Sequence, residues 1–497
     1  MLQKYPSSIS DPSARTSARR VAWIVLAGAL VTGGAAALLY ASSNLTLSHY
    51  DARAHLVVSR RVFDSLTPGW RQFGSVWLPL PHLLNLIATI PDWSYRTGGL
   101  SVLISMVALS AGLSAAAWRI AQRTGSMVAA LAGPALVLAN PNVLYLQSTP
   151  MTEPLLFGLT LLSVVAVDVC LEVRSESSAH RAGALLATLV LTRYEGWLVG
   201  GTLVVISVAL SWRRLRTIQQ LWLYPAGAVA VFLAASFAST GKWPLSDSFY
   251  VPDPELLHQP AVVMDKIWTG FLDLAGWPLA AGGLVGLFVL VIQALKARRH
   301  VLLYLALVAP VALPSMAFYS GHPFRIRYLI PMVVAAGVLA SFALAALPRR
   351  LQPVLALLVL ALAVWQRPPL DMKAPMVLEA QWETPFRLER EKVTAVLAAR
   401  DDGSPILASM GSLAHYMQEA SWAGLSLDRF LHEGNGDLWL DALKSPRRSV
   451  RWVLIEQRAE GGDVLFARAQ RDVTFLAGFE RVIEGGGLAL YERREGQ

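Results

Sequence analysis

Residues 21–40 read VAWIVLAGALVTGGAAALLY, an apolar run long enough to cross a lipid bilayer as one helix. Four basic residues precede it: Lys4, Arg15, Arg19 and Arg20. The run is longer than the apolar core of a typical signal peptide and lacks a clear cleavage site. We therefore interpret it as a retained first membrane span.

The amino-acid composition requires a membrane environment. Of 497 residues, 54% are hydrophobic and 15% are charged, and the mean hydropathy is +0.46, so the chain carries more apolar surface than a soluble protein can bury. The formal net charge of +9 is explained by cytoplasmic anchoring or by an anionic lipid ligand, and a nucleic-acid partner is discounted. The single Cys170 excludes an intrachain disulfide.

Further apolar runs follow, each judged against the roughly 20 residues that a span needs. They lie at residues 98–117, 126–146, 154–172, 182–198, 198–211, 220–239, 270–295, 301–319, 328–347 and 351–366. Together with the first run they predict a polytopic membrane domain at residues 21–366 with about eleven helices. Arg193 and Glu195 interrupt the apolar sequence, so two of the short runs can also be one broken helix.

Basic residues predict the orientation of these spans. If the spans alternate, the N-terminal tail (residues 1–20) and most basic clusters gather on one side, which the positive-inside rule assigns to the cytoplasm. The clusters are Arg119/Arg123, Arg174/Arg181, Arg213/Arg214/Arg216, Lys296/Arg298/Arg299 and Arg349/Arg350. We expect a multi-pass protein of the plasma (inner) membrane, with a cytoplasmic N-terminus and with the segment 42–97 and the C-terminal part outside.

The segment 42–97 departs from that rule, because it carries five arginines on the side where few are expected. They are Arg53, Arg60, Arg61, Arg71 and Arg96. Charge placed against the rule suggests an anionic ligand. Within the same segment, residues 76–90 are apolar but interrupted by two prolines and His82, which favours an interfacial or re-entrant helix over a span.

The C-terminal part, residues 367–497, is mixed and polar in composition. Short apolar runs near residues 405–409, 451–456 and 487–492 are typical of strands, and residues 386–397 and 412–417 show helical periodicity. These patterns predict a small α/β domain of about 130 residues. The domain either positions an acceptor or serves as a structural cap.

The sharpest polar motif is HYDARAHL at residues 49–56, directly after the first span. It combines two histidines, Asp51 and Arg53, which suits proton abstraction or metal coordination. The alternative is an amphipathic helix whose charges face water. His49, His55 and the distant Glu153 form a candidate ligand set for a divalent metal ion, the one cofactor that the residues suggest.

Three further polar motifs fall on the same predicted side. Glu153 lies in STPMTEP (148–154), where it can also act as a helix cap, and Arg193 and Glu195 lie in TRYEGW (192–197), where ionisable groups are costly without a role. The motif HPFRIRY (322–328) supplies His322, Arg325, Arg327 and Tyr328. Arginine pairs of this kind suit a lipid phosphate, although interfacial snorkelling is the alternative.

An acid after the first span, another after the third, an Arg-Tyr pair near a late span and a soluble C-terminal domain resemble the GT-C superfamily. These are integral membrane glycosyltransferases that use polyprenyl-phosphate-linked sugars, and the protein O-mannosyltransferase-like and aminoarabinose-transferase-like branches are nearest. Asp51 matches the catalytic acid of the family's first outer loop, and Glu153 the acid of its second. Asp51 is followed by Ala52, which departs from the paired Asp-Glu of the O-mannosyltransferases.

The resemblance implies an inverting transfer of a sugar to an extracytoplasmic lipid, glycan or protein. Asp51 would be the general base. Arg325, Arg327 and Arg193 would stabilise the leaving lipid phosphate. The remaining substrate-binding candidates are Arg53, His55, Glu153, Glu195, His322 and Tyr328. The expected partners are the polyprenyl-phosphate sugar donor, membrane lipids and the acceptor. The sequence shows no glycine-rich nucleotide-binding fingerprint.

Two other functions compete with this interpretation. Broken helices and intramembrane charges are also typical of secondary transporters, although repeated halves are not evident in the sequence. A lipid-binding membrane scaffold without catalytic activity is the second alternative.

Overall fold

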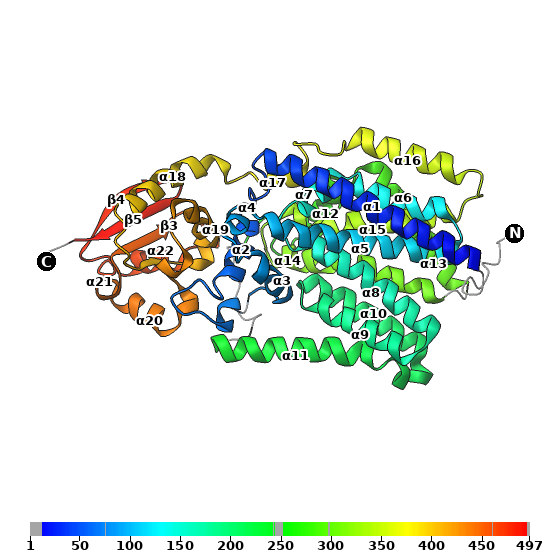
Figure 1. Ribbon diagram of the computed structural model, residues 1–497, viewed down its shortest axis with the longest axis horizontal. Coiled ribbons are helices and arrows are strands. Elements are labelled where there is room, and N and C mark those ends of the chain that lie inside the picture. The colour runs from blue at the N-terminus through cyan, green and yellow to red at the C-terminus, as the bar shows by residue number, and fades with distance from the viewer. Residues whose placement is uncertain are drawn as a thin grey trace. The chain divides into compact units, whose positions relative to one another are not determined.

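The computed structural model describes residues 12–74, 76–241, 243, 252–296, 299–459 and 461–494. Lys4 and Arg298, two of the basic residues from which the membrane orientation was predicted, lie outside the described residues. The chain forms two compact units (Figure 1). The helical unit comprises the described parts of Met1–Ser43, Val102–Phe232 and Asp253–Glu379, and the sheet unit those of Asn44–Ser101, Leu233–Pro252 and Ala380–Gln497.

The helical unit is built mainly from long apolar helices. Its elements are, in chain order, α1 (Pro12–Ser42), α5 (Gly99–Thr124), α6 (Met127–Leu138), α7 (Pro141–Gln147), α8 (Glu153–Val173), α9 (Glu176–Val190), α10 (Tyr194–Ser211), η2 (Trp212–Ile218), α11 (Gln220–Thr240), α12 (Pro260–Ala275), α13 (Trp277–Leu295), η3 (Arg299–Val311), α14 (Ala312–Tyr319), η4 (Ile326–Leu329), α15 (Ile330–Ala345), α16 (Gln352–Gln366) and α17 (Pro375–Glu379). Helices α5 and α11 begin or end in the other unit.

The described helices confirm a polytopic membrane protein. Eight of them are long and apolar enough to cross a membrane, or up to nine if α6 and α7, which are bent by 72° relative to each other, form one broken span. The expected runs at 182–198 and 351–366 correspond to α9 and α16, which have only 15 residues each. A capping box at Ser175 starts α9, and the extended Arg193 separates it from α10.

Small residues let the helices of this unit pack closely. A Cβ atom added at Gly286 of α13 would clash with the carbonyl of Leu339 of α15, and one added at Gly133 of α6 would clash with Ser341 of α15. Such contacts compensate for the absence of a hydrophobic driving force between helices in lipid. Helix α15 is buried along nearly its whole length between these neighbours.

The sheet unit contains one five-stranded sheet with the order β2-β1-β3-β5-β4. Strands β2 (Phe430–Leu431), β1 (Ile406–Ala408) and β3 (Trp452–Glu456) are parallel, and β5 (Leu488–Arg493) and β4 (Phe479–Gly485) are antiparallel. Its C-terminal helices are α18 (Thr384–Ala399), α19 (Met410–Ala420), η5 (Ser421–Ala423), η6 (Leu427–Arg429), η7 (Glu433–Asn435), α20 (Asp437–Lys444), α21 (Pro446–Ser449) and α22 (Val464–Arg471). The small α/β domain expected in the C-terminal part is therefore present.

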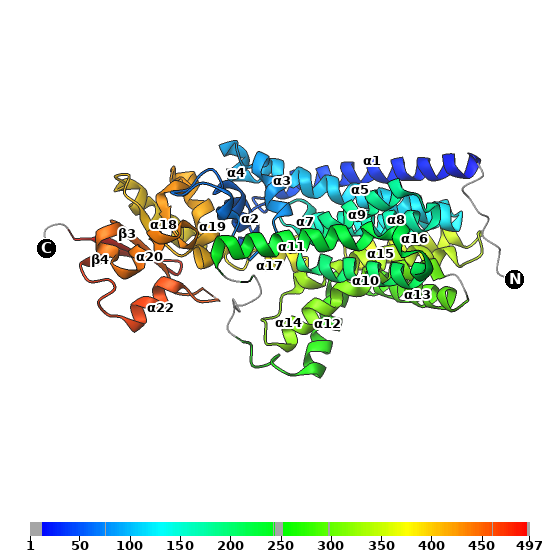
Figure 2. The ribbon, with the colours of Figure 1, turned by 90° about the horizontal axis from the view of Figure 1, so that it is seen from below.

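The first loop is part of this sheet unit. It forms α2 (Tyr50–Arg60), η1 (Trp70–Phe73), α3 (Leu80–Ala88) and α4 (Asp92–Thr97). Figures 1 and 2 both show α2 beside α19. Leu56, Val57 and Tyr95 belong to the same buried core as Met417 of α19 and Trp452 of β3. The loop and the C-terminal residues thus share one hydrophobic core.

Helix α3 corresponds to the predicted interfacial segment and has only 9 residues. Pro81, His82 and Asn85 are buried on one face, whereas Leu83, Leu84 and Ile87 are exposed on the other. An exposed apolar face on a short helix is the form that an interfacial helix takes.

A shared core predicts that a cavity in the loop weakens the sheet. Leu56→Ala removes a fully buried side chain, and we expect a loss of roughly 2–5 kcal/mol. Amide hydrogen exchange should rise in β3 as well as in α2. Leu83→Ala, at an exposed site of the same loop, is the control and should leave β3 unchanged. Faster exchange confined to α2 would contradict the shared core.

Candidate functional site

Asp51, the predicted general base, lies in the first turn of α2 and is 8% exposed. His49 caps this helix: its Nδ1 accepts a hydrogen bond from the Asp51 backbone N–H at 3.1 Å. The aromatic ring of Tyr50 stacks on the His49 ring with 4.8 Å between the centroids. A carboxylate in the first helical turn is favoured by the helix dipole. The start of α2 therefore holds Asp51 in a defined place.

Arg53 connects α2 to the C-terminal part of the sheet unit through an ion pair. Its Nε donates to the Leu47 carbonyl at 2.5 Å, and its Nη1 pairs with the Glu419 carboxylate of α19. Arg390 of α18 donates to the same carboxylate through Nη2 at 2.8 Å and Nε at 3.0 Å. Arg53 was expected to bind substrate, and the structure shows it in an internal ion pair.

These two arginines determine the charge state of Glu419. Burial by itself raises the pKa of a carboxyl group, but the charges and hydrogen bonds of Arg53 and Arg390 outweigh it and lower the pKa of Glu419 to about 2. Glu419 is therefore ionised throughout the physiological range. The nearby His415 is 3.3 Å from Glu383, and its pKa is lowered mainly by burial.

His55 lies in a cluster of three aromatic side chains of the first loop, with Trp77 and His82. Its Nδ1 is 3.1 Å from Nε2 of His82, and the centroid of the Trp77 ring is 4.2 Å from that of His55. Burial, followed by the charge of Arg61, lowers the pKa of His82 to about 3, so His82 is neutral. Among the residues that the structure describes, no group of three or more His, Cys, Asp or Glu side chains is arranged to hold a metal ion, so the set of His49, His55 and Glu153 is not assembled there.

In the helical unit, the second and third polar motifs come together. Glu153 is the first residue of α8 and is 1% exposed, and Arg193 precedes α10. Arg193 places Nη1 3.1 Å from Glu153 Oε1 and 2.8 Å from the Thr152 hydroxyl, and Nη2 2.9 Å from Glu195 Oε1. One guanidinium is thus shared by two buried carboxylates.

The fourth motif lies in the same unit and meets this group through Arg327. Arg327 is 6% exposed and close enough to Arg193 for the two positive charges to oppose each other. Its guanidinium lies 5.3 Å from the centroid of the Tyr328 ring, and the Tyr328 hydroxyl is 3.4 Å from Nε2 of His322. Arg325 is half-buried at the start of η4. Two arginines and two glutamates therefore share a small buried region.

Sequence reasoning missed several members of these groups. Glu419 and Arg390 lie hundreds of residues from Arg53, and no local pattern connects them. A different network was detectable, because Arg119 and Arg123 of α5 face Asp168 and Glu172 of α8, and both pairs are spaced four residues apart, on one helix face. The Arg119 Nε lies 2.7 Å from Asp168 Oδ2.

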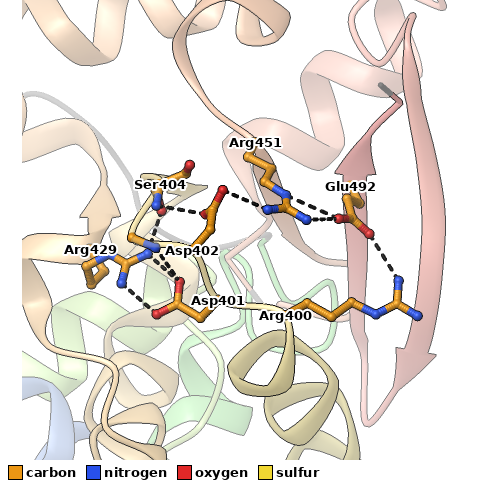
Figure 3. A network of polar contacts seen from close by, with 8 residues as sticks. Arg400, Asp401, Asp402, Ser404, Arg429, Arg451 and Glu492 are labelled. Atoms are coloured by element: carbon orange, nitrogen blue, oxygen red, sulfur yellow. Dashed lines mark hydrogen bonds and ion pairs between the residues drawn. The ribbon is translucent and has the colours of Figure 1, made fainter. Parts of the chain in front are cut away.

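Another polar network joins the segments that precede β1, β2 and β3 to one another and to β5 (Figure 3). Arg451 pairs with Asp402 at 2.7 Å and with Glu492 at 2.5 Å, and Arg400 also reaches Glu492. Arg429 pairs with Asp401 in the same view. These side chains are partly exposed, so each pair contributes little to stability. The paired residues all belong to the C-terminal part of the sheet unit.

No protein-family model matches the chain, and no curated protein matches its sequence. The structure is similar to that of ArnT from Cupriavidus metallidurans bound to undecaprenyl phosphate, with a TM-score of 0.57 and 14% identity, covering 94% of this chain and 98% of that one. The chain has the GT-C fold. The apo form of the same protein gives a TM-score of 0.57 at 15% identity. An oligosaccharyltransferase from Archaeoglobus fulgidus gives 0.49 at 11% identity, covering 95% of this chain and 74% of that one.

Within this GT-C fold, the shared guanidinium predicts a large effect of Arg193. Arg193→Met leaves the buried Glu153 and Glu195 uncompensated, and we expect a loss of roughly 3–5 kcal/mol in thermal unfolding experiments. Adding Glu153→Gln and Glu195→Gln to that variant should recover part of the loss. Arg181→Met, at an exposed site, is the control. An Arg193→Met protein as stable as the wild type would rule out the charge sharing.

The lowered pKa of Glu419 predicts a pH-dependent contribution to stability. An unfolded glutamate titrates near pH ~4.3, so the stabilisation is complete above that pH and is lost as pH falls towards the folded pKa of about 2. The stability difference between wild type and Glu419→Gln should therefore shrink between about pH 5 and pH 2. Glu480→Gln, at an exposed site of the same unit, controls for the loss of one carboxylate. A difference that stays constant over this range would contradict the ion pair.

Proposed function

We propose that this chain is a membrane glycosyltransferase that moves a sugar from a polyprenyl-phosphate donor to an acceptor outside the cytoplasm. The observation that carries the proposal is the structural similarity to an undecaprenyl-phosphate-bound ArnT over 94% of the chain. The buried arginines and carboxylates of the helical unit support it, because a lipid-phosphate substrate needs positive charge at a membrane surface. The acceptor is a lipid, a glycan or a protein.

In the proposed reaction, Asp51 is the general base. Its carboxylate takes the proton from the acceptor hydroxyl while the hydroxyl oxygen attacks the anomeric carbon of the donor. The bond between that carbon and the phosphate oxygen breaks, and the configuration inverts. A positioned base of this kind is worth about 10²- to 10⁴-fold in rate. His49 supports the role, since it fixes the backbone that carries Asp51.

The leaving group is a lipid phosphate, and we assign its stabilisation to Arg325, Arg327 and Arg193. Arginine forms paired hydrogen bonds with phosphate oxygens, and fixed charges need no reorganisation when the bond breaks. Glu153 and Glu195 hold Arg193, while His322 and Tyr328 line the surroundings of Arg327. We further propose that the protein resides in the plasma membrane with its N-terminus in the cytoplasm.

Sugar transfer in liposomes tests the proposal. Purified protein is supplied with a panel of polyprenyl-phosphate sugars, and wild type is compared with Asp51→Asn. We expect a fall in turnover of about 10²- to 10⁴-fold with donor binding retained, since only the proton acceptor is lost. Asp92→Asn removes an exposed carboxylate from the same loop and is the control. Normal turnover in Asp51→Asn would remove Asp51 from the mechanism.

The bent pair α6 and α7 keeps a secondary transporter as the second candidate, because broken helices are also found at transport sites. Uptake of a solute into liposomes by the wild-type protein, without transfer from any donor in the panel, would favour the transporter.

A further inference from the structure

Arg61 differs from its neighbouring arginines in the first loop. Arg53 pairs with Glu419, and Arg60 pairs with Asp64 and Asp92. Arg61 is 6% exposed, and no carboxylate of the described chain lies within ion-pair distance of it. Its Nη1 contacts the thioether sulfur of Met410, and its Nε has no hydrogen-bond partner among the described residues. A thioether is a weak acceptor, so among the described residues this buried charge has no direct ion-pair partner.

The contact with Met410 places Arg61 at the first residue of α19, a helix of 11 residues. Helix α19 follows β1 directly, so its N-terminus lies at the carboxyl edge of the parallel strands β2, β1 and β3. In α/β domains this edge is where ligands bind, and the N–H groups of a helix N-terminus attract anions. A buried guanidinium at such a place adds a second, independent source of positive charge.

An anion from the chain itself already occupies part of this place. The carboxylate of Glu433 accepts a hydrogen bond from the Met410 backbone N–H at 2.7 Å and another from the Ser409 hydroxyl. Residue Glu433 reaches the protein surface, but partial burial of its carboxyl group raises the pKa of that group. Its charge acts on Arg61 from beyond ion-pair distance. The Met410 N–H and the Ser409 hydroxyl therefore already bind one carboxylate of the chain, next to the protein surface.

The other charged or titratable neighbours of Arg61 are neutral. Burial, followed by the charge of Arg61, lowers the pKa of both His82 and His432 to about 3. His432 Nδ1 accepts a hydrogen bond from the Gly434 backbone N–H at 3.0 Å, so the proton of its neutral ring is on Nε2. The positive charge at this place therefore comes from Arg61 and not from the two histidines. The buried Asp463, which accepts a hydrogen bond from the Ser412 hydroxyl in the first turn of α19, is a second acid close to Glu433.

We propose that Arg61, the Ser409 hydroxyl and the N-terminus of α19 form a phosphate-binding site in the sheet unit, with Glu433 as the intrachain group that phosphate displaces. A planar guanidinium, a hydroxyl and a helix N-terminus together match the oxygens of a tetrahedral dianion. The phosphate is either free inorganic phosphate or the head group of an anionic lipid. The site is independent of Asp51 and of the transfer reaction.

The test is calorimetric titration of the full-length protein with inorganic phosphate, in a maltoside detergent that contains no phosphate. We expect saturable binding by wild type, binding about tenfold tighter by Glu433→Gln because the competing carboxylate charge is gone, and loss of binding in Arg61→Met. Arg71→Met removes an exposed arginine of the same loop and should bind as wild type does.

The two sources of phosphate are separated by a competition arm. Short-chain phosphatidylglycerol that displaces inorganic phosphate identifies a lipid head group as a ligand, and failure to displace it identifies free phosphate; either supports the site. Equal binding by Arg61→Met and wild type would overturn the proposal. A Glu433→Gln protein that binds phosphate no more tightly than wild type would also overturn the proposal. This second result does not depend on whether Arg61→Met folds.

Discussion

The ion pair between Arg53 and Glu419 is the interaction on which the arrangement of the sheet unit depends. It joins a helix of the first loop to one that lies more than 350 residues later in the chain. Arg390 supplies the second positive charge, so the buried carboxylate is compensated from both sides. Around it, Leu56 and Val57 complete a core with Met417 and Trp452. Because this core is shared, the loop that carries Asp51 has no separate fold of its own.

The helical unit also contains buried charges that are compensated by residues from different helices. Arg193 is shared by Glu153 and Glu195, and Arg327 adds a second positive charge nearby. Such a group is costly to bury, because each ion loses its hydration, and it persists only where geometry and hydrogen bonds compensate. A nearly balanced group of this kind is poorly suited as mere packing. The proposed role of the two arginines in binding a lipid phosphate would give this group a function beyond packing.

Much of the fold was predictable, because it depends on local patterns. Apolar runs such as 21–40 predicted membrane-spanning helices, and the strand-like runs near residues 405 and 451 predicted strands of the sheet. The structure confirms the GT-C fold that the resemblance implied. The grouping of Glu153, Arg193 and Glu195 was suggested by the prediction that all three lie on one side of the membrane. The partners of Arg53 and His55 did not, since Glu419 and His82 are brought near only by tertiary packing. The roles of the site residues stay predictions.

The arginines of the first loop explain why the positive-inside rule gave a contradictory signal there. That rule applies to short loops, whereas folded domains are translocated largely regardless of charge. The loop belongs to a folded unit, in which carboxylates of the same unit neutralise Arg53 and Arg60. The positive charges of Arg53 and Arg60 are therefore paired within the unit. Arg61, which follows α2 and is buried, has no ion-pair partner among the described residues, so our argument for an anion concerns this residue.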